Sequence, residues 1–276
     1  MGGRIAVVTG ASRGVGKGIA LGLGAAGATV YVTGRTTAPR RGARPGTIDE
    51  ASEDVTLLGG RGIAVRCDHG DDEDVAALFE RLQAEQGRLD ILVNNATSFP
   101  DPFPPQGVLW ELPVELLDAS FRVGLRSHYV ADLHAAPILI RQGGGLIVHV
   151  SSRGAVDYLF NAAYGIGKAG VDKLAADLAH ELRPHGVACV SLWPPLTNRD
   201  HDVVAELGLR PARHPAAAGL PGAFSPLLTG RAVAALAADP EIMSKSGIAL
   251  TVASLADEYG FADIDGATPP HPAVQQ

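Results

Sequence analysis

Tyr164 and Lys168 lie four residues apart at the start of a stretch whose apolar residues recur with a helical period. On a helix this spacing places both side chains on one face, with Cβ atoms roughly 5–6 Å apart. A phenol has a pKa near ~10, and a neighbouring ammonium favours the phenolate and lowers that pKa. Tyr164 is therefore a candidate general acid/base. Taken alone, the pair more often means a tyrosine beside a solvated lysine, so the assignment depends on the rest of the chain.

Two hydroxyl side chains, Ser151 and Ser152, follow the apolar run 146–150, which we expect to be a strand. A hydroxyl at this strand end could hold the oxygen of a substrate carbonyl or alcohol next to Tyr164. The pattern after it predicts a helix over residues 161–183, and Pro184 with Gly186 ends that helix.

A glycine-rich turn follows the first apolar run, residues 4–9, which is typical of a buried parallel strand. Gly10 permits a tight turn, while Gly14 and Gly16 allow close backbone approach at the start of a helix that runs to about Ala26. The N-terminus of that helix offers free N–H groups and a positive dipole end to a pyrophosphate. We expect the cofactor to contact this turn through Gly10, Ser12, Arg13, Gly14, Val15 and Gly16.

The end of the second predicted strand, 29–33, is followed by Arg35. In sheets of this type that strand end faces the adenosine ribose, where an acidic residue accepts the 2′-hydroxyl of NAD and an arginine pairs with a 2′-phosphate. No Asp or Glu occurs from Ala28 to Arg44, which favours NADP(H) over NAD(H), although an ordinary surface arginine is the alternative. Arg40, Arg41 and Arg44 could help to hold phosphate, but a solvated loop is the more common meaning of such a stretch.

Other residues of interest follow the remaining strands. Asp68 comes after the third strand, 63–67, where an adenine contact could form. Asn95 and Ala96, after the fourth strand 89–93, are expected to tie strand ends together and border the cofactor. Pro194, after the sixth strand 187–193, is a further cofactor candidate. The acidic cluster at 71–74 opens a predicted helix, 75–86, and we expect it to cap N–H groups rather than bind a metal.

Strands and helices alternate along the whole chain. This order predicts a single Rossmann-type domain over residues 1–276: one doubly wound parallel sheet of about seven strands with helices on both faces. Thr47 with Glu50 predicts a capping box. We also expect helices at 114–140 and 226–238, a seventh strand at 247–252, a flexible substrate lid at about 195–225 and a frayed tail at 266–276.

Bulk properties narrow the class of protein. The net charge of −7 gives no basic excess, so nucleic acid and anionic membrane surfaces are unexpected partners. Cys67 and Cys189 end apolar runs and are expected to be buried thiols in a reducing compartment. No secretory pattern and no apolar run of transmembrane length occurs, which predicts a cytoplasmic protein.

Four motifs together resemble the classical short-chain dehydrogenases/reductases: TGASRGVG (9–16), NNA (94–96), VSS (150–152) and YGIGK (164–168). Further stretches, VGLR at 123–126 and LADEYGFADIDG near the C-terminus, look like the dehydrogenase/reductase member 1 branch. The resemblance covers roughly residues 4–252. It implies a Ser–Tyr–Lys centre in which Tyr164 is the acid/base and Lys168 lowers its pKa and holds the nicotinamide ribose. It also implies assembly into a homodimer or homotetramer.

The chain departs from the family pattern at several positions. Gly124 stands where the family has a catalytic Asn that helps to hold a water in a proton relay. Thr97 replaces the glycine of NNAG, Pro195 replaces the glycine of Pro-Gly, and Arg199 replaces a threonine. The usual thirteen-residue spacing to Tyr164 selects Ser151, whereas strand register selects Ser152. We favour Ser152, because a register slip would turn every side chain of the strand to the opposite face.

Two functions of different class fit these residues. The first is an NADP(H)-dependent reductase or dehydrogenase acting on a carbonyl or alcohol; the second is an NADP(H)-binding sensor or scaffold with little turnover, suggested by Gly124. An apolar pocket for a ketone, aldehyde, quinone or steroid is expected from aromatic and apolar side chains near the strand ends, although each of them could instead pack its loop onto the domain. Arg153 and Arg199 are the basic residues there that could admit a carboxylate. The pocket candidates are Phe99, Phe103, Trp110, Tyr158, Leu159, Phe160, Trp193 and Phe224.

Overall fold

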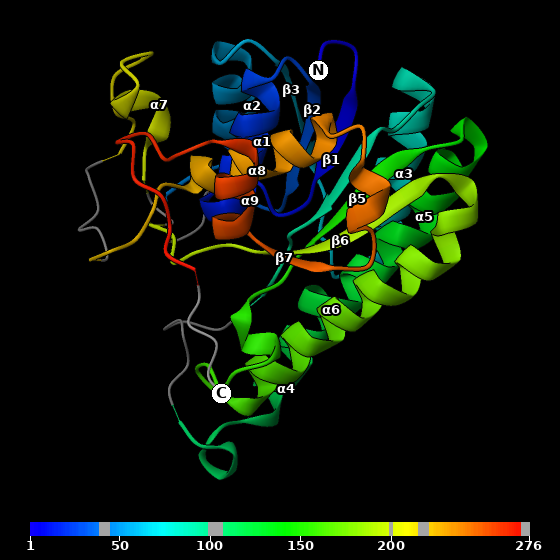
Figure 1. The fold of residues 1–276 in the computed structure, drawn as a ribbon, viewed down its shortest axis with the longest axis vertical. Helices are drawn as coiled ribbons and strands as arrows, with labels where there is room; N and C mark the ends of the chain where they lie inside the picture. The colour runs from blue at the N-terminus through cyan, green and yellow to red at the C-terminus, as the bar shows by residue number, and fades with distance from the viewer. Residues whose placement is uncertain (39–44, 99–106, 199–200, 215–220, 272–276) are drawn as a thin grey trace.

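A seven-stranded, entirely parallel sheet forms the centre of the molecule (Figure 1), in the order β3-β2-β1-β4-β5-β6-β7. The structure is a computed structural model, and it describes residues 1–38, 45–98, 107–198, 201–214 and 221–271. The strand order reverses between β1 and β4, and in open α/β sheets ligands bind outside the carboxyl ends of the strands at such a reversal. The strands are β1 Ile5–Val8, β2 Thr29–Gly34, β3 Arg61–Arg66, β4 Ile91–Asn94, β5 Gly145–Val150, β6 Val187–Trp193 and β7 Ala249–Thr251.

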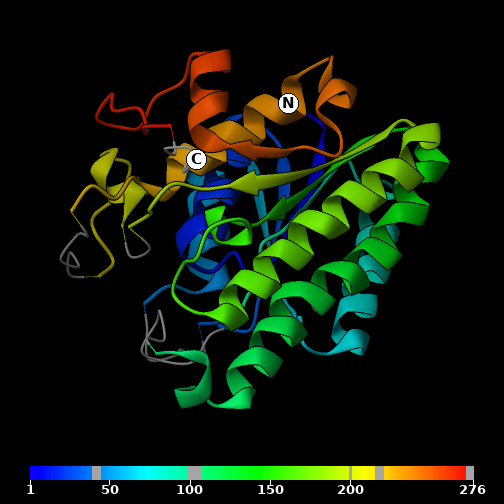
Figure 2. The same cartoon turned by 60° about the horizontal axis from the view of Figure 1, so that its bottom comes forward.

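Helices cover both faces of the sheet (Figures 1 and 2), as the sequence predicted. One face is covered by α1 Gly14–Ala25, α2 Ile48–Leu57, α8 Pro226–Ala238 and α9 Val252–Tyr259. The other is covered by α3 Asp72–Gln86, α5 Ser127–Gln142 and α6 Ala162–Leu182. α4 Val114–Phe121 continues into α5 through a π-helical turn, Arg122–Arg126, and α7 is Val203–Glu206. Short 3₁₀ turns lie at Leu109–Glu111, Arg153–Ala155, Arg183–His185 and Ile242–Lys245.

Alternate residues of each strand build two separate cores. Ile5 and Val7 of β1 pack with α3, α5 and α6, whereas Ala6 and Val8 pack with the helices of the opposite face. Because successive side chains of a strand point to opposite faces, a strand buried on both sides must be apolar throughout. This accounts for the continuous apolar runs in the sequence. Cys67 and Cys189 are free thiols in the core formed with α3, α5 and α6, and both are buried, as expected.

The helix termini largely follow their sequence signals. Thr47 and Glu50 form the predicted capping box of α2, and Asp71 caps α3 by accepting from the N–H of Glu73. The bounds of β6 and α8 agree with the prediction. The helix α9 was missed, because Thr251 caps a new helix where the sequence suggested the end of a strand. Among the described residues, no helix combines the length and the apolar character needed to span a membrane.

Candidate active site

The hydroxyl of Tyr164 lies at hydrogen-bond distance from a serine at the end of β5. Tyr164 Oη donates to Ser152 Oγ at 2.8 Å, and Ser152 Oγ also accepts from the backbone N–H of Gly154 at 3.1 Å. The Ser151 hydroxyl instead donates to the carbonyl of Lys168 at 3.1 Å. The structure therefore brings Ser152, and not Ser151, next to the candidate acid/base.

Local backbone features fix the Tyr164 ring. Asn161 caps α6 by accepting from the N–H of Tyr164 at 3.0 Å. Phe160 packs edge-on against the Tyr164 ring, with centroids 5.0 Å apart. It is the one non-glycine residue with a positive φ (64°) among those the structure describes. A Cβ at Gly154 would lie 2.5 Å from Tyr164 Cε1, so only glycine fits there. The strained backbone at Phe160 costs on the order of 1–3 kcal/mol and is typical of functional sites.

Lys168 follows one helical turn after Tyr164. Its Nζ donates to the carbonyl of Val150 at 3.1 Å and lies 5.9 Å from the centroid of the Tyr164 ring. Burial lowers the pKa of Lys168 to about 8, against the opposing effect of Asp172.

The prediction that Lys168 lowers the Tyr164 pKa is wrong for this structure. Burial raises the pKa of Tyr164, and the hydrogen bond with Ser152 opposes that rise only in part. The phenol is desolvated, and the ammonium is bonded to the Val150 carbonyl, so loss of hydration decides the direction. Tyr164 is consequently a protonated acid at neutral pH.

Sequence reasoning overlooked Asp172, one further turn along the same face of α6. Asp172 accepts from the Ser191 hydroxyl at 2.6 Å and from Trp193 Nε1 at 3.2 Å, both on β6. It thereby ties the helix that carries Tyr164 and Lys168 to the neighbouring strand. The repeat of polar residues at 164, 168 and 172 is the sequence signal that could have found it.

The glycine-rich turn joins β1 to α1, as predicted. Gly10 and Gly14 have positive φ values of 64° and 57°. Asn95 donates to the carbonyls of Thr9 and Gly10, at 2.8 and 3.1 Å, so the predicted link between the ends of β1 and β4 is confirmed. A Cβ at Gly16 would lie 2.3 Å from the Asn95 amide nitrogen.

The first turn of α1 is suited to an anion. Arg13, at the N-cap, makes no side-chain cap, and the first turn contains no acidic residue. By contrast, side chains cap α2, α3 and α6. The first-turn N–H groups of α1 therefore fit a phosphate group of a dinucleotide. Ser12 and Val15 belong to the same turn, and Pro194 directly follows β6.

Two guanidinium groups lie near the end of β2. Arg35 is largely exposed, and its Nη1 lies 3.9 Å from Asp68 Oδ2. Arg13 donates from Nη2 to Thr36 Oγ1 at 3.3 Å and to the Gly46 carbonyl at 3.1 Å. Arg40, Arg41 and Arg44 lie outside the described residues. Arg35 and Arg13 place positive charge near the end of β2, where the adenosine ribose is expected.

Gly124 lies in the π-helical turn and is buried. A Cβ at this position would lie 3.5 Å from Thr97 Oγ1 and 3.8 Å from Ser120 Oγ. Two hydroxyl groups therefore border the position at which the family pattern has an amide.

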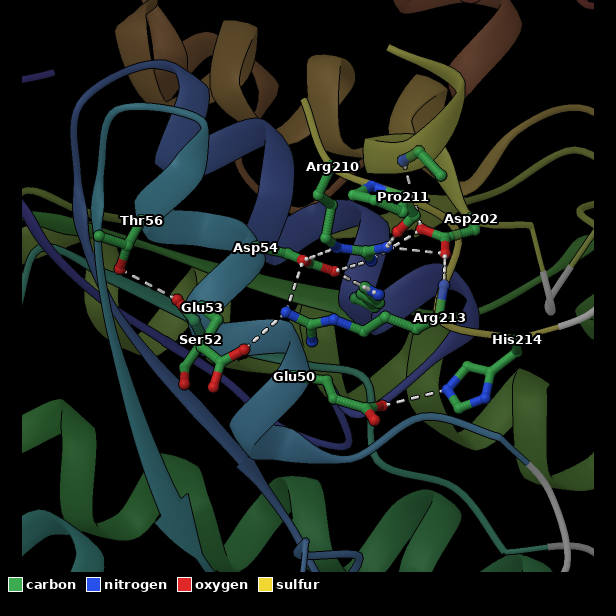
Figure 3. Close-up of polar contacts among 12 residues, drawn as sticks. Glu50, Ser52, Glu53, Asp54, Thr56, Asp202, Arg210, Pro211, Arg213 and His214 are labelled. Atoms are coloured by element: carbon green, nitrogen blue, oxygen red, sulfur yellow. Dashed lines mark hydrogen bonds and ion pairs between the residues drawn. The ribbon is translucent and has the colours of Figure 1, made fainter. Parts of the chain in front are cut away.

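The described part of the segment after β6 is held by ion pairs (Figure 3). Arg210 donates to both carboxylate oxygens of Asp54 on α2, at 2.8 and 2.9 Å, and to Asp202 at 2.8 Å. Asp54 is fully buried and also pairs with Lys17 of α1 at 2.7 Å. A turn of helix and the buried Asp54 carboxylate connect residues 201–214 to α1 and α2. That this segment covers a substrate stays a prediction.

The expected apolar pocket is only partly described. Trp110 and Tyr158 are strongly exposed, at 83% and 78%, whereas Phe224 packs against the core. Leu159 and Phe160 are half-buried, and Trp193 is bonded to Asp172. Arg153 is ion-paired with Asp157, so it is not an unpaired basic residue. Phe99, Phe103 and Arg199 lie outside the described residues, and so do 272–276 of the expected tail.

Comparison with known proteins gives consistent matches. A family model described as short chain dehydrogenase matches residues 4–207. The chain is 43% identical over 273 residues to Dehydrogenase/reductase SDR family member 1 of Homo sapiens, which covers 96% of this chain and 85% of that protein. A short chain dehydrogenase structure from Mycobacterium thermoresistibile matches with a TM-score of 0.80 and 26% identity, over 97% of this chain and 91% of that one. A structure of 7α-hydroxysteroid dehydrogenase complexed with NADH and 7-oxo glycochenodeoxycholic acid matches with a TM-score of 0.71 and 25% identity, over 91% of this chain and 92% of that one.

Proposed function

The chain belongs to the short-chain dehydrogenase/reductase family, and from that premise we propose that it is an NADP(H)-dependent oxidoreductase that interconverts a carbonyl and an alcohol on an apolar substrate. The observation that carries the proposal is the hydrogen bond of 2.8 Å between Tyr164 and Ser152. It brings a protonated phenol and a hydroxyl to one point, where both can contact a single substrate oxygen.

The chain's own residues supply proton transfer and orientation. The cofactor, when bound, supplies the hydride, and the turn from Gly10 to Gly16 with Asn95 and Ala96 would hold it. In the reductive direction Tyr164 donates its proton to the substrate oxygen, while Ser152 holds that oxygen by a hydrogen bond. Lys168 would hold the nicotinamide ribose through its ammonium. Asp172 keeps the helix of Tyr164 and Lys168 in place against β6.

The preference for NADP(H) rests on Arg35 and Arg13. Arg35 directly follows β2, the Arg13 guanidinium contacts Thr36 after the same strand, and a guanidinium pairs with a phosphate through two parallel hydrogen bonds. Asp68 opposes this preference, because its carboxylate lies 3.9 Å from Arg35. The related 7α-hydroxysteroid dehydrogenase was solved with NADH. If the two proteins prefer different cofactors, the residues responsible should lie at the end of β2.

Titration of NADPH and NADH, followed by nicotinamide fluorescence, tests the cofactor preference. We expect tighter binding of NADPH, and we expect Arg35→Asp to lose that preference. Arg88→Asp is the matched control, because Arg88 is an exposed arginine paired with Asp90 at the start of β4. Equal affinities in the wild-type protein would contradict the preference.

Turnover requires a separate assay, with a panel of aldehydes, ketones and quinones read at the nicotinamide absorbance. Oxidation of NADPH in the presence of an apolar carbonyl compound would support the proposal that the protein is an oxidoreductase. Tight NADPH binding without turnover on any member of the panel favours the second candidate, a cofactor-binding sensor, to which Gly124 in place of the family Asn points.

We also propose that the protein is a homo-oligomer. Tyr129 and Leu133 of α5 and Ile166 of α6 are large apolar side chains that are more than half exposed, and these two helices lie along one side of the molecule (Figures 1 and 2). Light scattering that gives only a monomer of 28.5 kDa at micromolar concentration would contradict this.

A further inference from the structure

A chain of buried polar side chains lies between the sheet and α5, behind the candidate active site. Its members are Asn94 at the end of β4, His149 on β5, and His128 and Asp132 on α5, and each is at most 2% exposed. Asn94 and His149 are register partners on adjacent strands. His128 and Asp132 are four residues apart, on one face of their helix.

The contacts run in one line. Asn94 Nδ2 donates to Asp132 Oδ1 at 2.7 Å. Asp132 Oδ2 lies 3.4 Å from His149 Nε2. His149 Nδ1 lies 3.5 Å from His128 Nδ1, and His128 Nε2 lies 3.1 Å from the carbonyl oxygen of Ala96.

With both histidine rings neutral, donor and acceptor arithmetic fixes the protons in this line; a His149 cation beside an Asp132 carboxylate is the alternative that the experiment below distinguishes. The Ala96 carbonyl can only accept, so His128 Nε2 must carry a proton. A neutral His128 then has a bare Nδ1, which needs a proton from His149 Nδ1. His149 Nε2 is in turn bare, and it faces Asp132 Oδ2. Two lone pairs would meet in that gap unless Asp132 is a carboxylic acid.

We propose that Asp132 is a carboxylic acid in the folded protein and that it, His149 and His128 form a directional, uncharged hydrogen-bonded chain that positions the Ala96 carbonyl. His128 and Asp132 are then positioning residues for Ala96, which would border the cofactor. This role rests on the proposed function. Burial supports the uncharged form, since it raises the pKa of Asp132 and lowers the pKa of His128 and His149.

Ala96 is the residue through which the chain reaches the site. Its N–H donates to Thr9 Oγ1 at 2.9 Å, and its carbonyl accepts from His128, so its backbone is held from both sides. Asn95, directly before it, ties β4 to the glycine turn. At the other strand, His149 precedes Val150, whose carbonyl accepts from Lys168. Loss of the hydrogen bonds among Asp132, His149 and His128 would therefore disturb both the glycine turn and Lys168.

The histidine tautomers test the proposal without any turnover. Two-dimensional ¹H–¹⁵N spectra of the ¹⁵N-labelled full-length protein distinguish a protonated ring nitrogen from a bare one, and single His→Gln variants assign the signals. We expect His128 to be protonated on Nε2 and bare on Nδ1, and His149 to be protonated on Nδ1 and bare on Nε2, at pH 7. A bare Nε2 on His128, or a His149 cation, would overturn the assignment.

A pair of substitutions tests the role of Asp132. The amide of Asp132→Asn can donate to His149 and accept from Asn94, so it preserves every hydrogen bond of the proposed chain. Asp132→Leu preserves the size and removes both bonds. We expect Asp132→Asn to keep the His128 signals and the NADPH dissociation constant within about threefold.

Asp132→Leu should shift the His128 signals and weaken NADPH binding by about tenfold or more. Equal damage from the two variants would overturn the proposal, because it would mean that a carboxylate is needed. Where Asp132→Leu does not fold, the wild-type tautomers and Asp132→Asn still decide. A protein that binds NADPH but reduces no carbonyl would refute the proposed reaction while leaving these signals intact.

Discussion

At the scale of single residues, the proposed proton donor, Tyr164, and the residue proposed to hold the cofactor, Lys168, are different side chains. Tyr164 is a buried phenol with a raised pKa, and Ser152 accepts its hydrogen bond. Tyr164→Phe removes the donor and keeps the ring that packs against Phe160. We expect turnover to fall by about 10²–10⁴-fold with NADPH binding and the melting temperature nearly unchanged. Wild-type turnover in this variant would place the acid elsewhere.

The two serines provide an internal comparison for the same prediction. Ser152→Ala removes the hydroxyl that bonds Tyr164, whereas Ser151→Ala removes one that bonds the Lys168 carbonyl. Steady-state rates should therefore fall more in Ser152→Ala. The larger loss in Ser151→Ala would contradict the assignment from the structure.

The buried, charged side chain of Lys168 should lower the free energy of unfolding. Its pKa is lowered to about 8 by burial, below the ordinary value near ~10.4, so the charged form is destabilised in the folded state. Lys168→Met removes that charge, and we expect the free energy of unfolding at pH 7 to rise by on the order of 1 kcal/mol while NADPH affinity and turnover fall.

Urea denaturation across pH checks the sign for Lys168. Between pH 8 and 10 the unfolded chain binds the Lys168 proton and the folded chain does not, so wild-type stability gains a rising contribution there. Lys168→Met should lack this contribution. An identical pH dependence in both proteins would contradict it.

The sequence predicted the positions of the candidate catalytic residues in the fold better than it predicted their surroundings. Tyr164, Lys168 and the glycine turn follow from local spacing, because helix periodicity and a strand–turn–helix order are short-range features. The same spacing could have identified Asp172 but not its partners on β6, and His149 could not be predicted in this way, since its partners are on α5. The direction of the Tyr164 pKa was wrong for a related reason. Burial depends on the whole fold, and it outweighed a neighbour that sequence alone could name.

At the scale of elements, Asp54 joins α1, α2 and the segment 201–214. It is fully buried and accepts from Lys17 and Arg210. Asp54→Asn would remove the carboxylate that pairs with Lys17 and leave Arg210 paired with Asp202, and the loss of one member of a buried ion pair costs about 3–5 kcal/mol. We expect a destabilisation of that order in urea denaturation. The control, Asp177→Asn, breaks an exposed pair with Lys173 and should change stability by less than about 1 kcal/mol.

A double variant distinguishes the ion pair from a general packing defect. Lys17→Met in the Asp54→Asn background removes the cation that Asp54 pairs with, so it should recover part of the stability lost by Asp54→Asn. Further destabilisation would show that the loss in Asp54→Asn comes from packing and not from an unpaired charge. The sequence missed this arrangement because residues 54 and 210 are far apart in the chain and neither belongs to a motif.

At the scale of the whole molecule, buried neutral histidines make stability sensitive to acid. His69, His128 and His149 are at most 5% exposed, and burial lowers the pKa of His69 to about 4 and that of His149 to about 3. Below pH ~6.5 these histidines bind protons in the unfolded chain but stay neutral in the folded chain, so the free energy of unfolding falls as the pH falls. Asp132 opposes this, because its pKa is raised in the folded state.

With three histidines against one carboxyl, we expect a loss of about 2–3 kcal/mol per pH unit between pH 6 and pH 4.5. Urea denaturation at several pH values measures it. His69→Gln should reduce the slope by about 1.4 kcal/mol per pH unit. A flat profile in the wild-type protein would contradict the three depressed values.

The π-helical turn at Arg122–Arg126 has a consequence for how this helix can change in length. A π-turn contains one residue more than the α-helical turn it replaces, and one residue corresponds to about 100° of rotation around the axis. Everything after Arg126 is therefore rotated by that angle relative to an uninterrupted helix. His128 and Asp132 face the sheet because of this offset. Substitution at an exposed position of the turn leaves the offset intact, whereas deletion of a single residue would swing both side chains away from β4 and β5. Insertion and deletion, rather than residue type, should therefore be the changes that natural variation avoids between α4 and α5.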